Sequence, residues 1–109
     1  MKELYVVNCC RTAIGSFGGA LKNTPAVDLG AIVIKEALNR AGVKPEQVDE
    51  VMFGCILTAA QGQNVARQAS IKAGIPYSVP AYTVARTFAQ VAPTFPAPTT
   101  VTFDIINKF

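Results

Sequence analysis

Three thiols are the side chains of this sequence best suited to covalent chemistry, and they stand at Cys9, Cys10 and Cys55. A cysteine attacks an acyl group as the thiolate, so a catalytic cysteine needs a base or a positive charge beside it. The sequence contains no histidine, which excludes an imidazole base from this chain. Cys9 and Cys10 are adjacent and point to opposite faces of a strand, and Cys55 lies in an apolar run. We therefore expect three buried, inert, reduced thiols.

A second group of chemically capable side chains stands in the stretch GQNVARQA. Gln63, Asn64 and Arg67 are polar residues at the predicted junction of a loop and a helix. Helix capping alone explains Asn64, because its side chain can accept a hydrogen bond from the first turn. Elsewhere, Arg11 could contact a phosphate or pair with a carboxylate, and the sequence favours the carboxylate.

A glycine-rich stretch, RTAIGSFGGALKN, carries Gly15, Gly18 and Gly19. Glycines allow positive φ and close approach of the backbone, so a phosphate cradle is one interpretation and a structural turn is the other. The spacing of the glycines matches neither the dinucleotide fingerprint nor the P-loop, which favours the turn.

These residues must be positioned by strands and helices that alternate along the chain. Leu4–Val7 predicts a buried strand, and the nearly continuous apolar run 51–57 predicts a strand covered on both faces. The order strand, helix, strand, helix, strand predicts an α/β fold with right-handed crossovers and a mostly parallel sheet. The expected elements cover residues 4–7, 24–42, 51–57, 64–73 and 81–84.

The best-marked element is the first helix. Thr24 is expected to cap it, with Pro25 at its first position and Asp28 near the positive end of the helix dipole. Gly42 is expected to end the helix in the left-handed conformation. Pro45 opens a short turn after it, Gly74 ends the second helix, and both helices present small or apolar faces to a core.

Composition narrows the possible functions. The chain has 109 residues, a net charge of +3 and 50% hydrophobic residues, so we expect at most one folded domain. It has no run of Lys or Arg interleaved with aromatic residues, which argues against a nucleic-acid partner. It has no apolar run long enough to span a membrane and no signal peptide, so a cytoplasmic location is expected. No CxxC pattern or histidine offers a metal site.

Three stretches together resemble one family: RTAIGSFGG, PAVDLGAIVIKEALNRAGVKPEQVDEV and GQNVARQASIKAGIP. Residues 2–84 closely resemble the N-terminal segment of thiolases, and within them the biosynthetic acetyl-CoA C-acetyltransferases. The resemblance implies a layered α/β fold built from two similar halves that assembles into dimers or tetramers. It implies the condensation of two acetyl-CoA molecules to acetoacetyl-CoA and CoA. The CoA thioesters are substrates, and no separate cofactor is implied.

The same resemblance implies roles for particular positions. In thiolases the region of Gln63, Asn64 and Arg67 lies near the subunit interface and supports the active site from behind. The nucleophilic cysteine follows the third strand, and counting in register from Val84 places its position at Phe88. A phenyl ring cannot be acylated, so the chain is expected to be inactive by itself and no catalytic residue is assigned.

Residues 85–109 differ in composition from residues 1–84, with prolines at Pro93, Pro96 and Pro98 and no glycine. We therefore predict a thiolase-like segment over 1–84 and an unrelated or frameshifted tail over 85–109, in which TTVTFDII could form a strand. Two hypotheses follow. The chain is a truncated thiolase-type acyltransferase that forms a homo-oligomer or needs a complementing thiolase chain, or it is a small noncatalytic α/β module that pairs with another chain through an open sheet edge.

Overall fold

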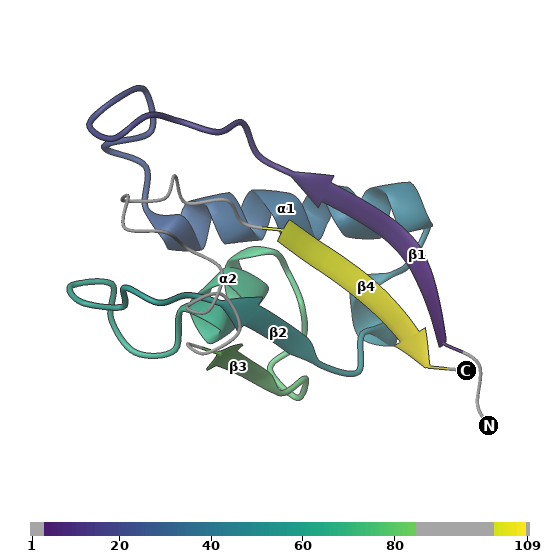
Figure 1. Cartoon of the computed structure of the whole chain (residues 1–109). Helices are drawn as coiled ribbons and strands as arrows, with labels where there is room; N and C mark the ends of the chain where they lie inside the picture. Colours follow the sequence, from purple (N-terminus) through teal and green to yellow (C-terminus); the bar gives the residue numbers. More distant parts are fainter. Residues whose placement is uncertain (1–3, 85–101, 109) are drawn as a thin grey trace.

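The computed structural model describes residues 4–84 and 102–108 and confirms the α/β class (Figure 1). The predicted order of strand, helix, strand, helix, strand holds over residues 4–84, and a further strand follows. Pro45 opens a short 3₁₀ helix, as expected. The elements are β1 (Leu4–Arg11), α1 (Ala26–Ala41), η1 (Pro45–Gln47), β2 (Val51–Gly54), α2 (Val65–Lys72), β3 (Ala81–Val84) and β4 (Thr102–Lys108).

The ends of α1 follow backbone geometry more than side-chain capping. Gly42 lies in the left-handed region at φ 65°, and its N–H and that of Val43 reach back to the carbonyls of the last turn, as predicted. The expected cap by Thr24 and the expected place of Pro25 at the first helical position are both wrong, because Pro25 is the N-cap and no side chain caps this end. The carbonyl of Pro25 accepts the N–H groups of Asp28 at 3.0 Å and Leu29 at 3.3 Å, so α1 begins with backbone contacts alone.

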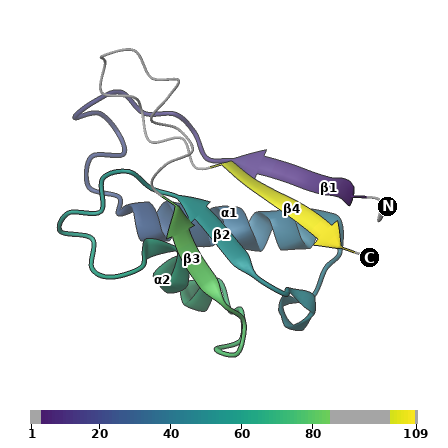
Figure 2. The ribbon, with the colours of Figure 1, turned by 60° about the horizontal axis from the view of Figure 1, so that its bottom comes forward.

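The strands form two short sheets. Strands β2 and β3 pair in parallel, with Val51 opposite Ala81 and Gly54 opposite Val84. The expected parallel pairing is present between β2 and β3, whereas β1 belongs to the second sheet. The hydrogen-bonded neighbour of β1 is β4, which runs antiparallel to it with a register shift between Val6 and Asn8. In both views β4 lies between β1 and β2 (Figures 1 and 2).

Both helices lie on one face of the strands, as Figure 2 shows. α1 contacts β1, β4 and α2, whereas α2 contacts β2 and β3. The core lies between these layers, and burial of its apolar side chains is the main stabilising term of the fold. Its buried members are Leu29, Ala31, Val33, Ile34, Ala37, Leu38, Val51, Phe53, Ala66, Ala69, Ala73, Ile75 and Val79.

The helices approach each other closely at Gly30. A Cβ placed there would lie 3.0 Å from the Cβ of Ala69 on α2 and 3.6 Å from the ring of Phe53. An ion pair between Lys72 and Asp28, at 2.6 Å, joins the same helices at their exposed edge. Small residues thus set the distance between α1 and α2, and β2 packs beneath them.

The strands are less buried than the sequence predicts. Val6 is 68% exposed in the segment expected to be a buried strand. β2 ends at Gly54 and alternates, with Val51 and Phe53 buried and Met52 52% exposed. The prediction of burial on both faces is therefore wrong for the described residues. The reason is that helices cover one face only, so apolar composition alone does not show how many faces are covered.

Candidate functional site

The candidate site lies where three strands end. β1, β2 and β3 run toward the same end of the molecule, and α2 begins there (Figures 1 and 2). Ligands of open α/β sheets bind outside the carboxyl ends of the strands, because the loops that follow the strands gather at that edge. The residues Gln63, Asn64 and Arg67, selected from the sequence, all stand at the start of α2.

Asn64 is the centre of a hydrogen-bond network. It adopts the left-handed conformation at φ 47°, and its Oδ1 accepts a hydrogen bond from the backbone N–H of Arg67 at 3.1 Å. Its Nδ2 donates to the carbonyl of Ala81 in β3 at 2.9 Å. The predicted helix cap is confirmed, and the same side chain also joins α2 to β3.

Arg67 fastens the segment that precedes β3. Its guanidinium donates to the carbonyls of Val79 and Tyr77, each at 2.6 Å, and lies 5.7 Å from the centre of the Tyr77 ring. Two charge-assisted hydrogen bonds to backbone carbonyls hold a segment firmly, because the planar guanidinium matches both acceptors at once. Arg67 therefore stabilises the backbone of the segment before β3.

Two further residues, which the sequence did not single out, complete the network. The hydroxyl of Thr83 accepts a hydrogen bond from the N–H of Ala66 at 3.1 Å and donates to Oδ1 of Asn64 at 3.1 Å. Gln68 donates to the carbonyls of Gln61 and Gln63, each at 2.9 Å. No sequence signal marks these partners, because the contacts join residues of different elements.

The loop held by Gln68 has an unusual backbone. Three of its residues have positive φ, namely Ala60 at 61°, Gly62 at 78° and Asn64 at 47°. Non-glycine residues in this region carry strain, which persists only where surrounding contacts fix the backbone. The two carbonyl contacts of Gln68 and the network of Asn64 supply that restraint. Gln63 itself is exposed, directly before the N-cap of α2.

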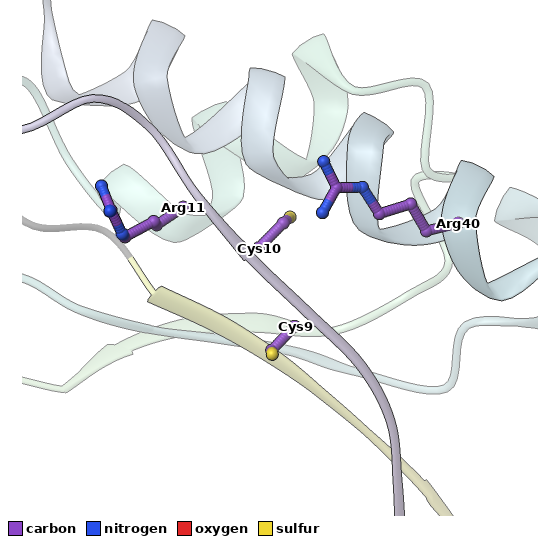
Figure 3. A pocket seen from close by; sticks show the side chains of 4 residues that line it. All are labelled: Cys9, Cys10, Arg11 and Arg40. Carbon is purple, nitrogen blue, oxygen red and sulfur yellow. The ribbon is translucent and has the colours of Figure 1, made fainter.

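The three cysteines do not share one site. Cys9 is exposed, which contradicts the expectation of a buried thiol, and Cys10 and Cys55 are half-buried. The cause for Cys9 is the strand alternation, which turns it away from α1 while Cys10 faces α1 (Figure 3). Cys10 donates to the carbonyl of Val33 at 3.3 Å, a weak hydrogen bond that ties β1 to α1. Cys55 makes a similar local contact to Leu57.

An open hollow of about 540 Å³ is lined by Cys9, Cys10, Arg11 and Arg40 (Figure 3). Burial raises the pKa of the Cys10 thiol, and this effect exceeds the opposing influence of the positive charge of Arg40. Arg40 is itself paired with Glu36 one helical turn away. The Cys10 thiolate is therefore not activated and Arg40 is paired, whereas Arg11 makes no ion pair within the described residues. With no activated nucleophile at Cys10, we assign the hollow no chemistry.

The glycine-rich loop forms turns. The N–H of Gly19 donates to the carbonyl of Ser16 at 2.9 Å, and Gly18 has a positive φ of 66°. These contacts favour the structural interpretation of the glycines. Arg11 reaches the carbonyl of Thr12 at 3.2 Å, a contact with neither of the partners expected for it.

Other expectations concern chemistry outside this network. Phe88, the predicted position of the nucleophile, lies outside the described residues. Within residues 4–84 and 102–108, no three His, Cys, Asp or Glu side chains gather in a way that could hold a metal ion. In that same part of the chain, no helix combines the length and the apolar character needed to cross a bilayer.

Comparison with known proteins places this arrangement in a family. Residues 4–91 match the family described as thiolase, N-terminal domain. The chain belongs to the thiolase family. The match includes all the residues of the Asn64 network, and it runs beyond β3 into the segment that holds Phe88. The predicted boundary between residues 84 and 85 stays a prediction.

Several thiolase relatives are similar over the same part. An acetyl-CoA acetyltransferase of Cupriavidus necator is 61% identical over 84 residues, which are 77% of this chain and 21% of that protein. A cytosolic acetyl-CoA acetyltransferase of Rattus norvegicus is 60% identical over 79 residues, 72% of this chain and 20% of that protein. The matched part is thus about a fifth of these relatives. An acetyl-CoA acetyltransferase of Clostridioides difficile is 49% identical over 84 residues, 78% of its own length.

Proposed function

We propose that this chain is the N-terminal unit of a thiolase-type acyltransferase. The family match over residues 4–91 carries the proposal, since it covers both helices and the first three strands. The complete enzyme would join two acetyl-CoA molecules into acetoacetyl-CoA and release CoA, in agreement with the names of the acetyl-CoA acetyltransferase relatives. A cytoplasmic location is part of the proposal and is supported by the cytosolic rat relative.

In the same proposal the chain does not turn over acetyl-CoA by itself. Acyl transfer to a thiol needs a thiolate, a base that regenerates it, and donors that stabilise the thioester oxyanion. In this chain position 88 is a phenylalanine, and the sequence provides no histidine. The half-buried thiol of Cys10 has a raised pKa and hydrogen-bonds to a backbone carbonyl, which disfavours its thiolate.

The network at the start of α2 is proposed to form a rigid support in the complete enzyme. Asn64 and Arg67 fix the approach to β3, and Gln63 is exposed directly before α2. A second thiolase chain, either another copy or a complementing segment, would then contact this end of the molecule. These roles follow from the family resemblance together with the position of the residues.

The first test is turnover of acetyl-CoA by the purified chain, followed as release of free CoA thiol and as formation of acetoacetyl-CoA. We expect neither product above the rate of a protein-free control. A full-length acetyl-CoA acetyltransferase is the positive control. Turnover that disappears when one cysteine is alkylated would contradict the proposed inactivity and make that cysteine a nucleophile.

A second candidate function is a noncatalytic module that binds another chain. The observation that favours it is the sheet face without helices, where Met52 and Tyr82 are cross-strand neighbours that are 52% and 38% exposed. Apolar side chains gathered on an open sheet invite association. Sedimentation of the purified chain at rising concentration tests this function. A monomer at all concentrations would argue against self-association.

A further inference from the structure

The end of β3 is tied to the first turn of α2 by one hydroxyl group. Thr83 is the last residue but one of β3, and its Oγ1 accepts the N–H of Ala66, the second residue of α2, at 3.1 Å. The first N–H groups of a helix have no partner within the helix, so each needs one from outside. Ala66 is fully buried, and water therefore does not take that place.

The direction of each hydrogen bond in this tie is fixed by the chemistry of the groups. Oδ1 of Asn64 can only accept, so the Thr83 hydroxyl must donate to it at 3.1 Å. The lone pairs of the same hydroxyl remain for the N–H of Ala66. Oδ1 also accepts the N–H of Arg67, and Nδ2 of Asn64 donates to the carbonyl of Ala81. The Thr83 hydroxyl thus donates and accepts at once.

The tie lies beside the last hydrogen bond of the β2–β3 sheet. The N–H of Cys55 donates to the carbonyl of Val84 at 3.2 Å, and Val84 is the last residue of β3. Val84 directly follows Thr83, so a shift of Thr83 away from α2 would move this carbonyl. The hydroxyl is therefore placed to control the position of the carboxyl end of β3.

We propose that Thr83 is a positioning residue whose hydroxyl locks the carboxyl end of β3 onto the N-terminus of α2. Its meaning for a thiolase rests on the proposed function, because the family resemblance places the nucleophile position, which is Phe88 in this chain, in the segment that follows this strand. The lock itself is a property of the described residues. The lock can therefore be tested without measuring turnover of acetyl-CoA.

The test is amide hydrogen exchange of the whole chain, measured residue by residue by NMR, in Thr83→Val and Thr83→Ser. Valine keeps the shape of threonine but leaves the N–H of Ala66 without an acceptor, which costs local stability. We expect exchange at Ala66 and Cys55 to rise by at least about fivefold relative to exchange at Ala37 in the buried part of α1. Serine restores the hydroxyl and should bring both amides back to within about twofold of the original values.

Three results would overturn the proposal. Exchange at Ala66 and Cys55 that stays unchanged in Thr83→Val would show that the hydroxyl holds nothing. An equal rise at Ala66, Cys55 and Ala37 would show general destabilisation without a lock at β3. Failure of Thr83→Ser to restore protection would show that the side-chain shape, and not the hydroxyl, matters. If Thr83→Val does not fold, Thr83→Ala gives the same comparison with a smaller side chain.

This experiment separates the lock from the proposed function. Local exchange can confirm the lock even if the purified chain proves to have an unrelated activity. Turnover by the chain would contradict the proposed inactivity and leave the exchange pattern at Ala66 as it is.

Discussion

At the scale of single residues, the same type of side chain behaves according to its neighbours. Cys9 and Cys10 are adjacent in β1, yet one is exposed and the other faces α1 and donates to a carbonyl there. Asn64 likewise owes its role to its partners, because its carboxamide reaches Arg67, Ala81 and Thr83 at once. Residue type therefore limits the possible chemistry, and the surroundings select among the possibilities.

The difference between the two thiols can be measured directly. At pH 8, iodoacetamide should modify Cys9 about tenfold faster than Cys10, because the thiolate is the reactive form and burial raises the pKa of Cys10. Mass spectrometry of the proteolytic peptides gives both rates, although the two residues must be separated by fragmentation. The denatured chain is the control, in which the rates should become similar. Faster modification of Cys10 in the folded chain would show that its thiol is activated.

At the scale of elements, small residues set the distance between the two helices. Gly30 lies where a methyl group would contact Ala69 and Phe53, and Ala69 is buried in the opposite helix. A glycine inside a helix normally weakens it relative to alanine. Its presence in α1 is explained by the packing of α2 and β2 against that position.

Gly30→Ala should therefore destabilise the chain by about 1–3 kcal/mol, although alanine favours helices in an open position. The measurement is the free energy of unfolding from urea denaturation. A second substitution, Ala69→Gly, removes the methyl group met by the new side chain. The double mutant should be more stable than the sum of the two single effects predicts, by more than about 0.5 kcal/mol.

Lys35→Ala, an exposed change on the same helix, is the matched control and should stay within about 0.5 kcal/mol of the original chain. A stabilising effect of Gly30→Ala would show that the helices can separate enough to admit a methyl group.

At the scale of the whole molecule, the main feature is that the described helices lie on one face of the two short sheets. Neighbouring side chains of β2 differ in exposure because they point to opposite faces: Met52 is 52% exposed and Phe53 is 5% exposed. The face of β2 and β3 opposite the described helices is the part of the molecule where the two candidate functions differ. A noncatalytic module would use it to bind its partner.

Substitution of Phe53 should change the free energy of unfolding far more than substitution of Met52. Phe53→Ala is expected to lower the free energy of unfolding by about 3–5 kcal/mol, because it opens a cavity between β2 and α1. Met52→Lys should change it by less than about 0.5 kcal/mol, because the side chain is half-exposed. If the chain self-associates through this face, Met52→Lys should also lower the associated fraction in sedimentation. A large loss of stability in Met52→Lys would mean that the face is covered in solution.

Part of the site could be predicted from the sequence because it depends on local rules. Asn64 before a helical segment indicated a cap, and Gly42 indicated a left-handed end, since both depend on residues within one turn. Thr83 and Gln68 were not predicted, because the partners of Thr83 are 17 and 19 residues away along the chain and those of Gln68 are 5 and 7 residues away. Nothing in residue type or spacing indicates which carbonyl or amide a folded chain will place beside them.

The sequence by itself determined the order of the elements, the α/β class and, through three long stretches, the thiolase resemblance that the comparisons confirm. These features depend on apolar periodicity and on residues that start or end helices, and such signals are local. Only the tertiary structure decided that β1 pairs with β4, that both described helices lie on one face of the strands and that Cys9 is exposed. Strand pairing and burial depend on contacts between distant segments, because hydrogen bonding and packing reward whichever segments the folded chain brings together.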